Sequence, residues 1–290
     1  MKPPPFTYVA PANLAEAIAV LAEHGGDAKV LAGGQSLVPL MNLRMARPSA
    51  LVDVCRLPEL AAVSLNGAIA IGATTRQRVV RDSPIVSRAW PVLVDALSHV
   101  GHPATRARGT IGGSIAHADP AAEIPALLVA LGGEIAAHGP GGERVIAADD
   151  LFISHFTTAL AEDEILTQVR LPLPAPGTVA AFSEVVRRRG DFALVGVVAV
   201  ARLDAAGHVQ SPRIVLFGID EVPLRATGAE QLITGHELDV ELIAAAARQA
   251  AEEIDPTADV QGSAEYRREL AEARVAHVLR ELTPQEGVAT

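Results

Sequence analysis

Two pairs of adjacent glycines constrain the folding of this 290-residue chain more than any other feature of its sequence. Each pair marks a place where the backbone turns sharply or where another group approaches it closely. Successive backbone N–H groups in such turns form a concave site for an anion, so both segments predict contact with a phosphate or pyrophosphate. The two segments are Ala32, Gly33, Gly34, Gln35, Ser36, Leu37 and Thr110, Ile111, Gly112, Gly113, Ser114.

Neither glycine segment fits a common nucleotide-binding pattern. Gly-x-Gly-x-x-Gly within a β-α-β unit is absent, and so is Gly-x-x-x-x-Gly-Lys-Ser/Thr, so neither a Rossmann site nor a P-loop is supported. A single glycine pair is more often an ordinary tight turn than a phosphate site. Two similar pairs leave open a dinucleotide that is held by two separate loops.

The first half of the chain predicts alternating strands and helices. Asn13 and Glu16 have the spacing of a helix cap, and Gly101 is expected to end a later helix that Pro91 interrupts. Residues 108–120 contain too many glycine and turn residues to predict a regular element. The expected strands are 29–31, 51–55, 69–73, 134–138 and 164–171, and the expected helical stretches are 14–24, 37–43, 84–100 and 121–131. Residues 29–55 read as a small β-α-β unit.

The second half of the chain has a different organisation. The proline-rich stretch 171–177 is typical of a linker between domains. Three expected strands, at 182–186, 193–203 and 213–219, precede three expected helices, at 226–234, 240–254 and 264–282. Strands followed by helices indicate an α+β layer with an antiparallel sheet.

Charge, hydropathy and cysteine content exclude several classes of function. A formal net charge of -10 argues against nucleic acid as a partner, because a phosphate backbone requires a basic face. No apolar run is long enough for a transmembrane segment, and Lys2-Pro3-Pro4-Pro5 is unlike a signal peptide, so we expect a cytoplasmic protein. Cys55 is the single cysteine and supports no disulfide, four-cysteine zinc site or iron–sulfur cluster. Any redox metal is therefore expected on another chain.

Three further groups of residues have both a functional and an ordinary interpretation. Asp119 and Glu123 fit acceptors for a ribose hydroxyl, but acids in a first helical turn also favour the helix dipole. The cluster Arg187–Phe192 is more often a solvated face than a binding site, and Phe192 by default packs in a core. The spacing of His99, His102 and His117 matches no zinc pattern, so no metal site is predicted.

Four segments in order resemble the FAD-binding medium subunit of the molybdenum hydroxylases, the family of aerobic carbon monoxide dehydrogenase, xanthine dehydrogenase and bacterial N-heterocycle hydroxylases. They are residues 32–44, 106–123, 189–193 and 262–270, and together they extend over nearly the whole chain. The resemblance implies an α+β FAD-binding fold of the vanillyl-alcohol-oxidase type (PCMH type) with two subdomains, followed by a C-terminal domain with an antiparallel sheet and helices. The expected domains are residues 1–57, 58–176 and 177–290.

The resemblance also implies roles for individual residues. Both glycine segments would surround the pyrophosphate and its neighbouring groups, and Glu123 would bind on the adenosine side. Phe192 would lie close to the isoalloxazine ring, with Arg187 or Arg188 near its polar edge. Further expected cofactor contacts are Gly101, Asp119 and Leu166. This chain departs from some relatives at Phe192, where they have tyrosine, and at Gln35, where carbon monoxide dehydrogenases commonly have histidine.

The function implied by the resemblance is that of an electron-transfer oxidoreductase subunit. FAD is expected on this chain, molybdenum–pterin on a large partner subunit and two 2Fe-2S clusters on a small one, in a heterotrimer or its dimer. Electrons from the clusters would reach FAD and leave to an external acceptor. Two alternatives remain open: a stand-alone FAD-dependent oxidase, and a flavin-free scaffold that retains the fold.

Overall fold

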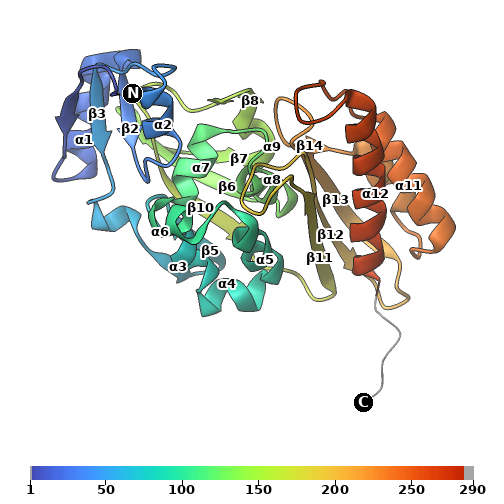
Figure 1. Ribbon diagram of the computed structural model, residues 1–290. Helices are drawn as coiled ribbons and strands as arrows, with labels where there is room; N and C mark the ends of the chain where they lie inside the picture. The colour runs from blue at the N-terminus through green and yellow to red at the C-terminus, as the bar shows by residue number, and fades with distance from the viewer. Residues whose placement is uncertain (1, 284–290) are drawn as a thin grey trace. The chain divides into compact units, whose positions relative to one another are not determined.

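The structure, a computed structural model, describes residues 2–283 and has an α+β fold (Figure 1). The chain divides into two compact units whose segments alternate along the sequence. The first unit contains the chain up to Arg88, His102–Ala118 and Gly132–Pro172. The second contains Ala89–Gly101, Asp119–Leu131 and the chain from Leu173 onward. The division at residues 57 and 176 stays a prediction.

A small parallel sheet begins the first unit. Its central strand is β3, and both β1 and β2 pair with it in parallel. Asn13 caps the helix α1, and its Oδ1 accepts a hydrogen bond from Glu16 N at 2.9 Å, which confirms the predicted cap. The β-α-β unit is confirmed as β2–α2–β3. The bounds are β1 Thr7–Val9, α1 Leu14–His24, β2 Ala28–Leu31, α2 Leu37–Asn42 and β3 Ala50–Asp53, with a 3-10 turn at Gly25–Asp27.

A five-stranded antiparallel sheet in the order β4-β5-β10-β6-β7 forms the rest of the first unit's strand structure, with a separate short hairpin, β8-β9. The strands are β4 Val63–Leu65, β5 Ala68–Gly72, β6 Glu134–Gly139, β7 Gly142–Ala147, β8 Phe152–Ser154, β9 Thr157–Thr158 and β10 Ile165–Pro172. The helices are α3 Gln77–Arg81, α4 Pro84–Ala89, α6 Pro103–Arg108, α7 Ile111–His117 and α9 Ala148–Leu151, with a 3-10 turn at Pro58–Leu60.

The expectation of irregular chain over residues 108–120 is wrong, because α7 occupies Ile111–His117. Thr110 caps this helix, and its side chain accepts a hydrogen bond from Gly113 N. Capping and packing therefore overcome the low helix propensity of two adjacent glycines.

The second unit is built on a four-stranded antiparallel sheet in the order β11-β12-β13-β14. This confirms the predicted antiparallel layer. The helices α10, α11 and α12 contact the sheet or one another, and α5 and α8 also pack on its strands. The bounds are α5 Pro91–His99, α8 Glu123–Ala130, β11 Thr178–Val185, β12 Val195–Leu203, β13 Val209–Phe217, β14 Leu224–Arg225, α10 Thr227–Ile233, α11 Val240–Glu252 and α12 Ala264–Leu282.

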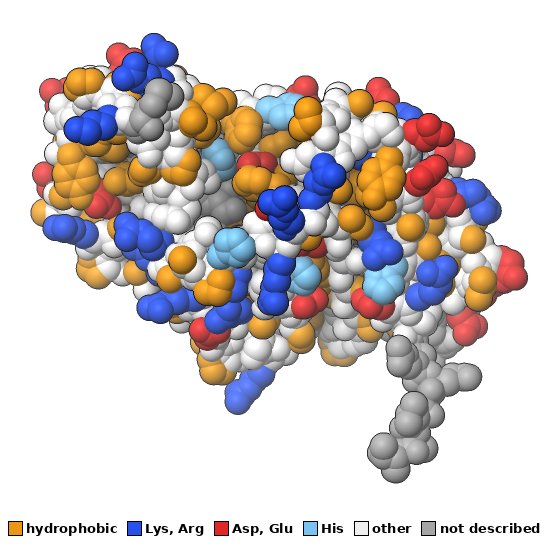
Figure 2. All heavy atoms as spheres, in the orientation of Figure 1, with side chains coloured by type: hydrophobic (Ala, Val, Ile, Leu, Met, Phe, Trp, Pro, Cys, Tyr) orange, Lys and Arg blue, Asp and Glu red, His pale blue; other side chains and the backbone are white. Residues whose placement is uncertain are grey.

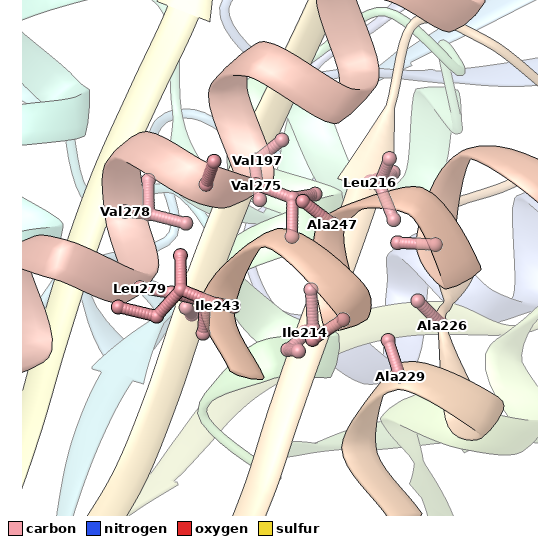
Figure 3. Packing of buried hydrophobic residues seen from close by; sticks show 14 of the residues in the cluster. Val197, Ile214, Leu216, Ala226, Ala229, Ile243, Ala247, Val275, Val278 and Leu279 are labelled. Atoms are coloured by element: carbon pink, nitrogen blue, oxygen red, sulfur yellow. The ribbon is translucent and has the colours of Figure 1, made fainter. Parts of the chain in front are cut away.

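Alternating residues of β12 divide between the two faces of this sheet. Val195, Val197, Ala199 and Ala201 belong to a core of small apolar side chains shared with α10, α11 and α12 (Figure 3). Period-two alternation places Gly196 and Val198 on the opposite face. Burial of this shared core stabilises the second unit by about 25 cal/mol for each Å² of apolar surface removed from water.

The surface of the second unit carries charges of both signs where α11 and α12 lie. Figure 2 shows Asp and Glu side chains there together with Lys and Arg side chains. No helix between residues 2 and 283 has the length and apolar character needed to cross a membrane.

Candidate functional site

The first glycine segment connects β2 to α2 within the first unit. Gly34 has φ +69°, in the left-handed region that favours glycine. The Gln35 side chain folds back, and its Nε2 donates to Gly33 O at 3.1 Å. The segment is therefore an ordered turn.

The second glycine segment lies against residues 73–77, which follow β5. Ile111 N donates to Thr75 O at 3.1 Å, and Gly112 N donates to Ala73 O at 2.9 Å. A Cβ atom on Gly112 would lie 2.5 Å from Ala73 Cβ, so only glycine permits this approach. Residues 73–77 thus hold the start of α7, a role for which the sequence offers no recognisable motif.

The structure brings the two glycine segments together in the first unit. A Cβ atom on Gly33 would lie 2.5 Å from Arg108 O and 2.8 Å from Gly109 Cα. On the other segment, a Cβ atom on Gly113 would lie 3.3 Å from Ala32 Cβ. Segments more than 70 residues apart in sequence therefore pack backbone against backbone, and the glycines permit that close packing.

The two segments differ in the hydrogen-bonding groups that they leave for a ligand. The N–H groups of Ile111, Gly112 and Gly113 are all used within the protein. By contrast, across residues 2–283 no acceptor is found for the N–H groups of Gly34, Gln35 and Ser36. The row of N–H groups that fits an anion thus belongs to the first segment. The second segment packs against the first at Ala32 and Gly33. Such a row suits the pyrophosphate of a dinucleotide.

Arg76 also contacts the place where the two glycine segments pack together. The sequence does not predict a role for it. Its Nη1 donates to Arg108 O, the same carbonyl that lies against Gly33. An isolated arginine ahead of a short helix carries no recognisable signal, because its importance comes from the fold that places it beside residue 108.

Asp119 and Glu123 lie in the second unit at the start of α8. Asp119 Oδ1 accepts a hydrogen bond from Ala121 N at 2.9 Å, so this carboxylate orders the turn before the helix. Glu123 is the first residue of α8 and is only 6% exposed. An acid in that position is stabilised by the positive end of the helix dipole and is suited to accept from a ligand hydroxyl.

The turn between β11 and β12 presents Arg187, Arg188 and Phe192 to solvent. Asp191 N donates to Arg188 O at 3.0 Å, and Gly190 has φ +89°. Phe192 is 60% exposed, so the interpretation that it packs in the core is wrong. An exposed aromatic ring beside a pair of cations on an ordered turn is suited to contact a flat ligand.

The other two predicted cofactor contacts, Gly101 and Leu166, lie outside these segments. Gly101, in the second unit, has φ +48° just after α5. Leu166, in the first unit, is 6% exposed and lies beside an irregularity in the pairing of β10 with β6. Within each unit the structure thus gathers part of the predicted set: the two glycine segments in the first, and the Asp119–Glu123 and Arg187–Phe192 segments in the second.

Burial displaces the pKa of a carboxyl group on β11 and of the single thiol. Burial raises the pKa of Glu184 on β11, although the imidazole of His99 lies 3.0 Å away and opposes the shift. Burial also raises the pKa of the Cys55 thiol, with Arg76 acting in the opposite direction. Among the described residues, no three His, Cys, Asp or Glu side chains are grouped to hold a metal ion.

Comparison with known protein families identifies the chain. The FAD binding domain in molybdopterin dehydrogenase matches residues 4–174, and the CO dehydrogenase flavoprotein C-terminal domain matches residues 180–282. The chain belongs to the FAD-binding medium subunits of the molybdenum hydroxylases. The predicted family, fold class and oxidoreductase class are thereby confirmed.

Individual relatives of this flavoprotein subunit cover almost its full length. The alpha subunit of the 6-hydroxypseudooxynicotine dehydrogenase complex of Paenarthrobacter nicotinovorans is 42% identical, over 96% of this chain and 95% of the relative. A carbon monoxide dehydrogenase structure from Hydrogenophaga pseudoflava superposes with a TM-score of 0.95 at 38% identity, over 98% of this chain and 100% of the other. Quinoline 2-oxidoreductase from Pseudomonas putida 86 gives a TM-score of 0.92, also at 38% identity, over 97% and 98%.

Proposed function

We propose that this flavoprotein subunit holds FAD without a covalent bond and that its first glycine segment binds the pyrophosphate. The observation that carries the proposal is the row of N–H groups at Gly34, Gln35 and Ser36, which have no acceptor in the described part of the chain. The backbone packing of Gly33 on Arg108 and Gly109 keeps that row in place. Bound FAD supplies the redox chemistry, and the protein binds and orients it.

Two segments of the second unit are proposed as further contacts of FAD. Glu123 accepts a hydrogen bond from a ribose hydroxyl on the adenosine side, as carboxylates do in other dinucleotide sites. Phe192 lies against the isoalloxazine ring, and Arg187 or Arg188 places a positive charge near its polar edge. The exposure of all three side chains of the turn leaves them free to contact the cofactor.

We further propose that the electrons come from two 2Fe-2S clusters on a small partner subunit, which receives them from molybdenum–pterin on a large one. One cysteine cannot ligate such clusters, so the chain requires a partner for them. Relatives of nearly equal length carry names that specify carbon monoxide, quinoline or caffeine. Such different names among similar subunits support the proposal that the substrate is selected on another chain.

The visible spectrum of the purified chain, repeated on the supernatant after acid precipitation, tests the flavin proposal. Flavin bands that move into the supernatant are the expected result. Bands that remain with the precipitate would instead support the stand-alone oxidase with a covalently attached flavin. A colourless protein that fails to bind added FAD would support the flavin-free scaffold.

Affinity purification of the chain from its native cells tests the partners. We expect two co-purifying subunits, with molybdenum and iron in the complex and a heterotrimer or its dimer by mass. Recovery of the chain alone with full activity toward an organic substrate would overturn this arrangement. Cell fractionation of the same lysate tests the proposed cytoplasmic location.

A further inference from the structure

Arg267 is a buried cation on α12 that the proposed function does not yet use. Its side chain lies one turn inside the helix, and the residue is only 6% exposed. Nη1 donates to Leu194 O at 2.6 Å and to Gly218 O at 3.0 Å. Nη2 donates to Asp259 Oδ2 at 2.8 Å. Burying a guanidinium is unfavourable unless it is paired in this way, so its location is specific.

The two carbonyls that Arg267 binds lie next to the two segments of the second unit that carry candidate cofactor residues: Leu194 follows the Arg187–Phe192 segment, and Gly218 is hydrogen-bonded to the Asp119–Glu123 segment. Leu194 follows Phe192 by two positions, and its N–H donates to Val185 O at 2.8 Å, which closes the β11–β12 turn. Gly218 N donates to Pro120 O at 2.8 Å, and Pro120 lies between Asp119 and Glu123. One guanidinium thus connects the Phe192 turn with the Glu123 segment.

Gly218 packs closely against the chain that follows the Phe192 turn. Gly218 has φ +77°, and a Cβ atom on it would lie 2.8 Å from Ala193 O and 3.3 Å from Leu194 O. The backbone of Gly218 therefore packs closely against Ala193 and Leu194. Arg267 gives the carbonyls of Leu194 and Gly218 a charged hydrogen-bond donor in this buried setting.

The loop before α12 binds the second terminal nitrogen of Arg267 through Asp259. Asp259 Oδ1 accepts hydrogen bonds from Gln261 N at 2.8 Å and Gly262 N at 3.0 Å, and Oδ2 faces Arg267. Ser263 then caps α12 by accepting from Tyr266 N. The segment 262–270, which is part of the family resemblance, therefore builds a fixed platform for one arginine.

We propose that Arg267 is a positioning residue that holds the Phe192 turn and the Glu123 segment in fixed register, so that the flavin and adenosine ends of FAD are bound together. The proposal rests on the FAD site proposed above. Arg267 acts through the backbone of Leu194 and Gly218. The last helix that the structure describes, α12, would thereby contribute to FAD binding without touching the cofactor.

The test compares Arg267→Met with Arg268→Met in the full-length chain. Arg268 is the next residue on α12, its side chain is 43% exposed, and it donates to Ile254 O and Asp255 Oδ1, which lie outside both segments. In fluorescence titrations with FAD we expect Arg267→Met to bind about tenfold more weakly, a loss of about 1.4 kcal/mol. Arg268→Met should match the wild type. The midpoint potential of bound flavin should shift in Arg267→Met alone, because a purely structural role would lower stability without changing that potential.

Arg267→Lys keeps the test decisive if the methionine variant does not fold. A lysine ammonium is a single point donor and cannot reproduce the planar two-armed contact with Leu194, Gly218 and Asp259. In the flavin-free chain, hydrogen exchange at Leu194 N and Gly218 N should become faster in Arg267→Lys, while the amides of α11 keep wild-type protection. Unchanged exchange at both amides would overturn the proposal, and so would unchanged FAD affinity and potential in a folded Arg267→Met.

These results are separable from a failure of the FAD proposal itself. If the wild-type chain binds no FAD, the proposed function is wrong whatever Arg267 does. If the wild type and Arg267→Met bind FAD equally well, only the positioning role is wrong.

Discussion

At the scale of single residues, Gly33 allows the two glycine segments to touch. A Cβ atom there would lie 2.5 Å from Arg108 O, so Gly33→Ala should push the two segments apart. We expect the affinity for FAD to fall about tenfold, which is a loss of about 1.4 kcal/mol in binding free energy. Gly141→Ala is the matched control, because its added methyl group would meet nothing within 4 Å. Titration with FAD measures the affinity of each variant, and circular dichroism checks that each variant is folded. Equal affinities in the two folded variants would contradict the role given to Gly33.

Glu184 predicts a pH-dependent stability. Burial raises its pKa above the usual value of 4.5, His99 opposes the shift and Asp95 adds to it. The folded state therefore holds this proton more tightly than the unfolded chain. The free energy of unfolding falls as the pH rises from 4.5 through the raised folded pKa, and this contribution is constant above it.

Glu184→Gln removes this titration. The difference in the free energy of unfolding between the variant and the wild type should therefore grow in favour of the variant across the same pH window. Urea unfolding at several pH values measures it, with Glu241→Gln, an exposed acid on α11, as the control. Parallel curves for Glu184→Gln and wild type would contradict the prediction.

At the scale of elements, Gly196 on β12 faces the ring of Phe217 on β13. The two are direct cross-strand partners, and a Cβ atom on Gly196 would lie 2.0 Å from the ring. Gly196→Ala should lower the free energy of unfolding by about 1–3 kcal/mol through overpacking. Urea unfolding measures the loss, and adding Phe217→Leu should restore part of it. Additive losses in the double variant would show that the ring and the methyl group do not collide.

The elements also show what could be predicted from the sequence. The expected bounds of α12, residues 264–282, match the structure because Ser263 is a strong local cap and the helix is long. The helix α7 is missed because two adjacent glycines oppose helix formation locally, while Ala73, Thr75 and Thr110 stabilise it through contacts made only in the fold.

The same limit applies to the candidate site. The glycine pairs identify both segments, since a glycine requirement is visible in sequence. Their mutual packing and the division of free N–H groups between them are not visible, because both depend on contacts between distant residues. The exposure of Phe192 is likewise set by the turn that presents it, whereas its sequence surroundings suggested burial.

At the scale of the whole molecule, the second unit needs two helices from the first half of the chain. The helices α5 and α8 pack on β11, β12 and β13, and the Phe182 ring lies 5.2 Å from that of His99. A fragment of residues 177–290, the predicted C-terminal domain, lacks both helices. We expect it to bind a hydrophobic dye and to unfold over a broad urea range. A sharp cooperative transition without dye binding would show that the fragment is an independent domain.

The alternation of segments between the two units has a consequence for synthesis of the chain. The chain passes from one unit to the other after residues 88, 101, 118, 131 and 172. All segments of the first unit have been synthesised once Pro172 has left the ribosome. The helices α5 and α8, however, pack on β11, β12 and β13, which are translated later. At about 5–20 residues per second, the buried faces of Leu97 and Leu127 remain uncovered for seconds. Nascent chains stalled soon after Pro172 should therefore be the form of this protein that chaperones bind most strongly.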